Sequence, residues 1–208
     1  MQAVAFLAIF LFFPSAAVAE NPGQEPIRVM LSIRGVIERP ALWFDAGAEK
    51  AVVLLHQYGV TSQSWTPFAE LLHSEKISSI APSGSSGEDA LAAVEFLEEK
   101  GVKNITLIGA SMGGGAAQQA ASKVEPDQLD GVILLGTATG AALSSPDYPK
   151  LFIHARDDFF MGRSVESYNK AADPKTLVEL PGAKHAQELL EGEQQHFLQQ
   201  MILGFIRD

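Results

Sequence analysis

The sequence predicts an α/β protein in which a mostly parallel, doubly wound sheet lies between two layers of helices, a three-layer α/β/α sandwich. The main observation is that short runs of apolar residues alternate along the chain with segments of helical spacing. Strands that are apolar on both faces are typical of a parallel sheet covered by helices. The length of 208 residues suits a single domain, whose core is large enough to fold without cross-links.

The predicted strands and helices take turns from residue 51 onward. Four strands are continuous apolar runs and two are weaker, and they cover residues 51–55, 105–108, 132–135, 151–153, 77–81 and 176–180. The helical segments cover residues 65–75, 88–100, 113–123, 162–172 and 188–206. Residues 27–44 alternate apolar and polar side chains as one or two extended segments, which we expect to form an antiparallel edge.

The first 19 residues are expected to form a cleavable signal peptide. They carry no charge, are apolar from Ala3 to Phe13, and end in the small-residue triplet Ala17-Val18-Ala19. The segment lacks the usual basic start, so an uncleaved anchor and a buried N-terminal helix remain alternatives. The expected product is secreted or periplasmic, with no stable membrane span after cleavage, and residues 20–41 follow as a linker and edge strand.

Composition excludes several classes of function. A net charge of −10, with 15 basic and 25 acidic residues, argues against a nucleic-acid partner, which would require cations facing phosphates. The absence of cysteine excludes a thiolate nucleophile and thiolate metal sites. The histidines are not spaced as metal ligands, and no nucleotide-binding fingerprint occurs, so neither a metal nor an organic cofactor is expected. The sequence leaves the oligomeric state open.

Gly109-Ala110-Ser111-Met112-Gly113 lies between a predicted strand and a predicted helix. In such a G-x-S-x-G turn the serine sits on a bend too sharp for β-carbons at its flanks, and its hydroxyl projects above the sheet. The next helix then directs its amino end at that hydroxyl. Ser111 is therefore the candidate nucleophile; the alternative is a glycine-rich packing turn.

Two further strand ends carry groups that suit a serine nucleophile. Asp157 and Asp158 follow the strand at 151–153, and His185 follows the strand at 176–180. Each taken alone is also compatible with an ordinary solvated turn. In the chain order Ser, Asp, His, however, all three sit at carboxyl ends of strands, where the chemistry of parallel sheets collects.

At these motifs the chain resembles the α/β-hydrolase superfamily, specifically its small, lidless members similar to esterases and dienelactone hydrolase. The resemblance spans roughly residues 42–206, within a domain taken as 42–208. It rests on LLHQYG at 54–59 followed by Ser64-Trp65, GASMGG at 109–114, LFIHARDD at 151–158 and LPGAKH at 180–185. It implies Ser111, His185 and Asp158 as the catalytic residues. Asp157 lies one residue before the position at which the family has its acid. Dienelactone enzymes use a cysteine, which this chain lacks, so that activity is not implied.

The resemblance also implies the binding groups around the nucleophile. The backbone N–H groups of Tyr58 and Met112 would form the oxyanion hole. Gln57 stands where the family usually has glycine, so a side chain there would narrow the pocket or shift the donor to Gln57 itself. Substrate contacts are expected from Gln57, Trp65 and Phe159, although a packing role is an equal or better account of both aromatic residues.

The resulting hypothesis is a serine hydrolase that cleaves carboxylic esters through an acyl-enzyme. A thioesterase, amidase or peptidase would use the same residues, and a non-catalytic binding protein on the same fold is a further alternative. Residues 137–149, where many relatives insert a helical cap, number only 13, so no cap domain is expected. An open site favours small or surface-accessible ester or acyl substrates.

Overall fold

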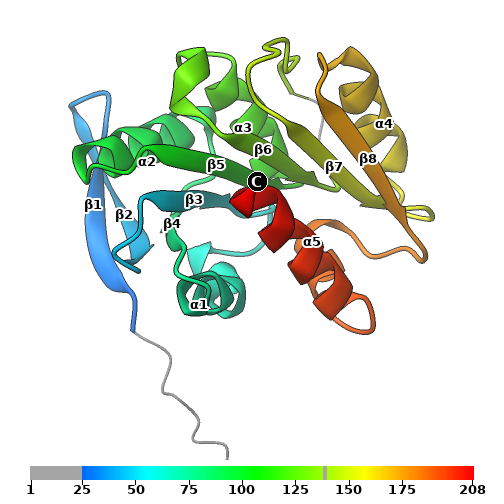
Figure 1. Ribbon diagram of the computed structural model, residues 1–208, viewed down its shortest axis with the longest axis horizontal. Helices are drawn as coiled ribbons and strands as arrows, with labels where there is room; N and C mark the ends of the chain where they lie inside the picture. The colour runs from blue at the N-terminus through cyan, green and yellow to red at the C-terminus, as the bar shows by residue number, and fades with distance from the viewer. Residues whose placement is uncertain (1–24, 138–139) are drawn as a thin grey trace, which may run out of the picture.

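The computed structural model describes residues 25–137 and 140–208. The expected signal peptide at 1–19 lies outside the described residues. From Ile27 on, eight strands form a single sheet, drawn in Figure 1. The strands are β1 Ile27–Ile33, β2 Ile37–Phe44, β3 Lys50–Leu55, β4 Ser78–Pro82, β5 Asn104–Ala110, β6 Gly131–Leu135, β7 Lys150–Ala155 and β8 Lys175–Leu180.

The order of the strands in the sheet is β1-β2-β4-β3-β5-β6-β7-β8. All neighbours from β4 to β8 pair in parallel, whereas β1 pairs with β2 and β2 pairs with β4 in antiparallel fashion. The predicted antiparallel edge at 27–44 is therefore confirmed as a hairpin. Because order runs outward in both directions from β3, the sheet is doubly wound.

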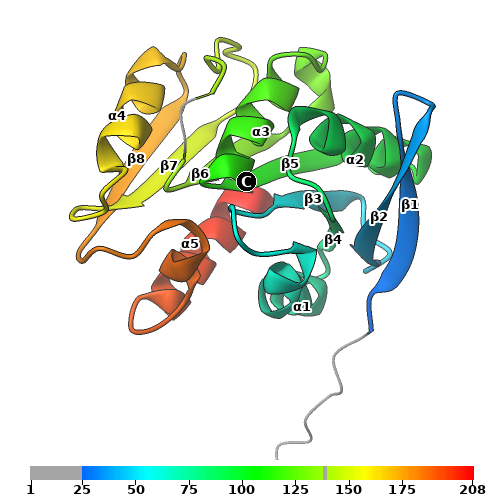
Figure 2. The same cartoon turned by 180° about the vertical axis from the view of Figure 1, so that it is seen from behind.

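Within residues 25–137 and 140–208, five α-helices cover the two faces of the sheet, which Figures 1 and 2 show from opposite sides. One face packs against α2 (Gly87–Glu99), α3 (Met112–Ala121) and α4 (Met161–Lys170). The other packs against α1 (Thr66–Ser74) and α5 (Gln195–Arg207). Short 3-10 turns occupy Ser62–Trp65, Pro126–Gln128 and Ala186–Leu190. The predicted α/β/α sandwich is confirmed.

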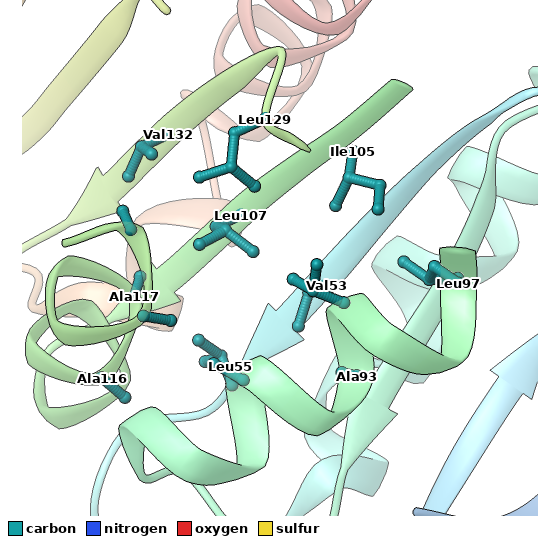
Figure 3. Close-up of a cluster of buried hydrophobic side chains, with 14 of the residues drawn as sticks. Val53, Leu55, Ala93, Leu97, Ile105, Leu107, Ala116, Ala117, Leu129 and Val132 are labelled. Carbon is teal, nitrogen blue, oxygen red and sulfur yellow. The ribbon is translucent and has the colours of Figure 1, made fainter. Parts of the chain in front are cut away.

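Alternate residues of each central strand serve the two cores, as strand geometry requires. In β3, Val53 and Leu55 face α2 and α3, whereas Val52 and Leu54 face α1 and α5. Figure 3 shows Val53 and Leu55 of β3 together with Ile105 and Leu107 of β5, between the strands and two helices. The alanines of α3, such as Ala117, are also in this core, and they let the helix pack close to the sheet. The segments 51–55 and 105–108 carry apolar side chains on both faces because helices cover both faces of the sheet.

The helix predicted at 188–206 is shorter than expected. Residues Ala186–Leu190 form a 3-10 turn, and α5 begins only at Gln195. Gly192, at φ 78°, places the chain in the left-handed region between the two elements. The apolar spacing of Leu189 and Leu190 continues that of the helix because both pack into the same core, so periodicity alone did not reveal the break.

No helix lies between β6 and β7 in the part of the chain that the structure describes. This agrees with the expectation that no cap domain is present. Within residues 25–137 and 140–208, no helix is long and apolar enough to cross a bilayer.

The close approach of α3 to the sheet can be tested with a pair of glycine variants. A Cβ at Gly113 would lie 2.2 Å from the backbone oxygen of Leu55, which cannot move cheaply, whereas a Cβ at Gly204 in α5 would meet no atom within 4 Å. We expect Gly113→Ala to lower the free energy of unfolding by about 2 kcal/mol or more, because the strand or the helix must shift.

The matched variant Gly204→Ala should instead raise the free energy of unfolding by about 0.5–1 kcal/mol, because alanine costs less entropy in an exposed helix position. Urea denaturation of both variants checks the pair. An equal effect of the two substitutions would contradict the close approach.

Candidate active site

The carboxyl ends of the parallel strands bring four loops to one edge of the sheet. These loops follow β3, β5, β7 and β8, and they carry the residues that the sequence singled out. Parallel register puts the ends of neighbouring strands at the same level, so residues far apart in the chain become neighbours.

Ser111 occupies the turn between β5 and α3 in a conformation that L-residues rarely adopt. Its φ is 48° and its ψ is −111°. A Cβ at Gly109 would lie 2.4 Å from the backbone oxygen of Gly113. The glycines flanking the serine are therefore required by the tightness of the turn, as their spacing predicted.

Ser111, His185 and Asp158 form a continuous chain of hydrogen bonds. The Oγ of Ser111 lies 2.8 Å from His185 Nε2, and His185 Nδ1 lies 2.7 Å from Asp158 Oδ2. The Asp158 side chain is buried, whereas the imidazole is partly exposed. Because Asp158 occupies Nδ1, the imidazole has Nε2 free to accept the proton of the serine hydroxyl.

The structure separates the two neighbouring aspartates. Asp158 is 6 % exposed and its second oxygen, Oδ1, accepts the backbone N–H of Phe160 at 2.9 Å. Asp157 is exposed, and its own backbone N–H donates to the oxygen of Gly182. Of the two aspartates, Asp158 is the one in contact with His185.

The imidazole is also held by its local chain and by an aromatic neighbour. The backbone N–H of His185 donates to Glu188 Oε2 at 3.3 Å, in a capping box that starts the 3-10 turn. Ala186 follows at φ 52°, a constrained conformation for a residue with a side chain. The ring of Phe160 lies 5.1 Å from that of His185, centroid to centroid.

The expected oxyanion donors lie in the loops that flank the serine. Met112 is the first residue of α3, where backbone N–H groups have no partner within the helix. Tyr58 lies in the turn after β3, and its side chain is largely exposed. A Cβ at Gly113 would touch the backbone oxygens of Leu55 and His56, so the turn after β3 begins against the first turn of α3.

Gln57 does not supply a free donor. Its backbone N–H donates to Gln187 Oε1 at 3.1 Å. The option that the oxyanion donor shifts to Gln57 is therefore disfavoured, and Tyr58 and Met112 remain the candidates.

The expected substrate contacts fall in different surroundings. Phe159 is 92 % exposed and packs edge to face against Phe160 at 5.1 Å. Trp65 is instead buried in the core and lies 6.1 Å from Phe68, ring to ring. A cavity of about 390 Å³ lies beside the site, and its walls include Gln57, Ser64, Trp65, Phe68, Gln187 and Leu190.

The remaining histidines near the sheet edge lie outside this chain of hydrogen bonds. His56 is buried, with Nδ1 2.9 Å from the oxygen of Gln57 and Nε2 3.2 Å from that of Ser83, so its ring braces the turn after β3. His154 is fully buried in β7, with Nε2 3.7 Å from Glu179 Oε2. The hydrogen bond from Arg156 lowers the pKa of the Glu179 carboxyl.

Metal and cofactor sites were not expected from the sequence. Among the described residues, no group of three or more acidic or histidine side chains is arranged to hold a metal ion.

Sequence reasoning left Phe160 open between an acyl pocket and the core, and it missed Gln187. Phe160 contacts His185, and Gln187 bonds the turn after β3. The sequence offered a weak signal for Phe160, because it lies two residues after the aspartate. It offered none for Gln187, whose partner lies 130 positions away.

The strain at Ser111 can be measured without reference to any activity. Ser111→Ala and Ser111→Gly both remove the hydroxyl, but only glycine relieves the positive φ of 48°. We expect the glycine variant to be more stable than the alanine variant by about 1 kcal/mol, since relief of strain exceeds the entropy that glycine adds to the unfolded chain. Urea midpoints check this, and an alanine variant of equal or greater stability would contradict it.

Comparison with known proteins agrees with this architecture. A family model described as the alpha/beta hydrolase fold matches residues 81–162. Dienelactone hydrolase from Anabaena variabilis is similar in structure, with a TM-score of 0.72, 18 % identity, and 88 % of this chain and 98 % of that chain covered.

Two esterases are also similar in structure. An esterase from Thermogutta terrifontis has a TM-score of 0.68 at 17 % identity, covering 87 % of this chain and 98 % of its own. An esterase from Exiguobacterium antarcticum has a TM-score of 0.69 at 11 % identity, covering 88 % and 100 %. The arrangement of the elements and these likenesses show that the chain has the α/β-hydrolase fold.

Proposed function

We propose that this chain is a serine hydrolase that cleaves carboxylic esters through an acyl-enzyme on Ser111. The fold and the comparisons support hydrolase activity in general. The observation that carries the finer proposal is the continuous hydrogen-bond chain from Asp158 through His185 to Ser111. A hydroxyl, an imidazole and a buried carboxylate in this order are the parts that acyl transfer requires.

In the proposed reaction, His185 Nε2 accepts the proton of Ser111 as Oγ attacks the carbonyl carbon of the ester. Asp158 keeps the proton of the neutral ring on Nδ1 and stabilises the imidazolium that forms. The imidazolium then gives its proton to the leaving alcohol, and an ester joins the acyl group to Ser111. A water molecule, deprotonated by His185, attacks that ester and releases the acid.

The negative charge on the carbonyl oxygen is proposed to be held by the backbone N–H groups of Tyr58 and Met112. The amino end of α3 adds a favourable dipole at the same place. Each donor in such a hole typically stabilises the transition state by about 3–4 kcal/mol.

The open surroundings of the site support small or surface-presented esters as substrates. No cap helix separates β6 from β7 among the described residues, and Phe159 beside the site is almost wholly exposed. On this side of the site, a long acyl chain would find little apolar surface to bury it. With the signal peptide expected at 1–19, we propose that the protein acts in secreted or periplasmic form.

An activity-based probe tests this proposal directly. A fluorophosphonate should label the unaltered protein by phosphonylating Ser111 Oγ, because the probe reacts only with an activated serine. Labelling should be lost in Ser111→Ala and in His185→Ala, as read by in-gel fluorescence. Absence of labelling in the unaltered protein would favour a non-catalytic binding role.

A second experiment compares kcat/KM on matched ester, thioester and amide substrates. The highest value on the ester separates the proposed activity from a thioesterase, amidase or peptidase that uses the same residues.

The two adjacent aspartates provide a matched pair of variants. Asp158→Asn should lower kcat by about 10⁴-fold, because the amide fixes the wrong tautomer of His185 and cannot stabilise the imidazolium. Asp157→Asn should leave kcat within about twofold of the unaltered value, since that exposed side chain does not contact His185. Steady-state hydrolysis of a p-nitrophenyl ester measures both, and the reverse pattern would remove Asp158 from the mechanism.

A further inference from the structure

Two glutamines from distant parts of the chain are joined by a reciprocal pair of hydrogen bonds. The backbone N–H of Gln57 donates to Gln187 Oε1 at 3.1 Å, and the backbone N–H of Gln187 donates to Gln57 Oε1 at 2.9 Å. We call this pair of contacts the glutamine bridge. Each side chain caps the backbone of the other residue, so both residues are fixed in position and in direction.

The bridge has a third anchor in the turn before α1. Gln187 Nε2 donates to Ser64 Oγ at 2.9 Å, and that hydroxyl donates to the oxygen of Thr61 at 2.7 Å. Gln187 therefore uses its backbone N–H, its side-chain oxygen and its side-chain nitrogen. A side chain with all of these groups engaged has little freedom to move.

The bridge lies next to both loops of the proposed reaction. Gln57 immediately precedes Tyr58, and Gln187 follows His185 by two residues. Ala186, which lies between His185 and Gln187 in the sequence, is buried and has a φ of 52°. A Cβ at Gly136 would lie 2.8 Å from the backbone nitrogen of Ala186. A displacement of Gln187 would therefore pass to His185 through a short and closely packed connection.

The other contacts of His185 do not link it to the turn after β3. Asp158 orients the imidazole, but it comes from the loop after β7. Within the described parts of the chain, the hydrogen bonds that link the segment 185–190 to the segment 56–64 all involve Gln187. The hydrogen-bonded link between the base and the turn after β3 thus runs through Gln187 and its partners.

We propose that Gln57 and Gln187 are positioning residues, which hold the base on His185 in register with the oxyanion donor on Tyr58. The inference rests on the proposed function and names two residues that act through others. The side chain at position 57, in place of the glycine usual in the resembled family, is what makes the second bond of the bridge possible. Small displacements of reacting groups have large effects on rate, so loss of the bridge should be visible in kcat.

Methionine variants test the bridge while nearly preserving side-chain length and volume. Gln57→Met and Gln187→Met each remove the polar groups of one side chain. We expect each to lower kcat on p-nitrophenyl acetate by about tenfold, with KM changed by about twofold or less. The double variant should lose about twofold further at most, because the two side chains serve one contact.

The matched control is Gln200→Met. Gln200 is an exposed glutamine of α5, and its side chain makes no hydrogen bond to any of the described residues. Its kcat should equal that of the unaltered protein. The rate constant for fluorophosphonate labelling is a second measurement that needs no turnover, and it should fall in the bridge variants in parallel with kcat. Thermal midpoints confirm that each variant is folded at the assay temperature.

The outcomes separate this inference from the proposed function. An unaltered protein that neither labels nor hydrolyses the ester overturns the proposed function, and the bridge inference with it. An active protein whose bridge variants keep a normal kcat overturns the bridge inference alone. A change confined to KM, or independent and fully additive losses in the double variant, also overturns it, because the glutamines would then line the neighbouring cavity without positioning the base.

Discussion

The tight packing between the first turn of α3 and the end of β3 is the constraint on which the rest of the site depends. There is no space for a side chain at Gly113, where the backbone of Leu55 lies against the helix. The turn before it must therefore be sharp, and Ser111 adopts an unfavourable conformation in order to make it. Packing in the two cores of the sheet maintains that conformation, so stability built elsewhere in the fold holds the half-buried Ser111 in place at the sheet edge.

Most of the fold is predictable from the apolar runs and the helical spacing in the sequence. Runs such as 51–55 and 105–108 are apolar on both faces because helices cover both faces, and that is why they predict a parallel sheet. The break before α5 was not predictable from periodicity, because Leu189 and Leu190 enter the same core as the helix that follows. The helical conformation is interrupted there by the backbone, which is extended at Glu191 and has a positive φ at Gly192.

The site was predictable to the extent that it lies at strand ends. Ser111, Asp158 and His185 each follow a strand, so the architecture brings them together once the order of the strands is right. The partners of Gln57 were not predictable, because they depend on how loops with no periodic pattern fold against one another. The buried surroundings of Trp65 could not be told from a substrate contact either, because an aromatic residue at a helix start suits both roles.

The strand that leads to His185 is the last of the sheet. β8 pairs with β7 on one side, and several of its residues are half-buried or exposed, unlike the wholly buried β7. Edge strands of this kind open locally at a lower free energy than the centre of a sheet. Warming would therefore detach His185, the proposed proton acceptor, while the strands around Ser111 are still intact. Loss of the proposed activity would then precede the collapse of the molecule as a whole.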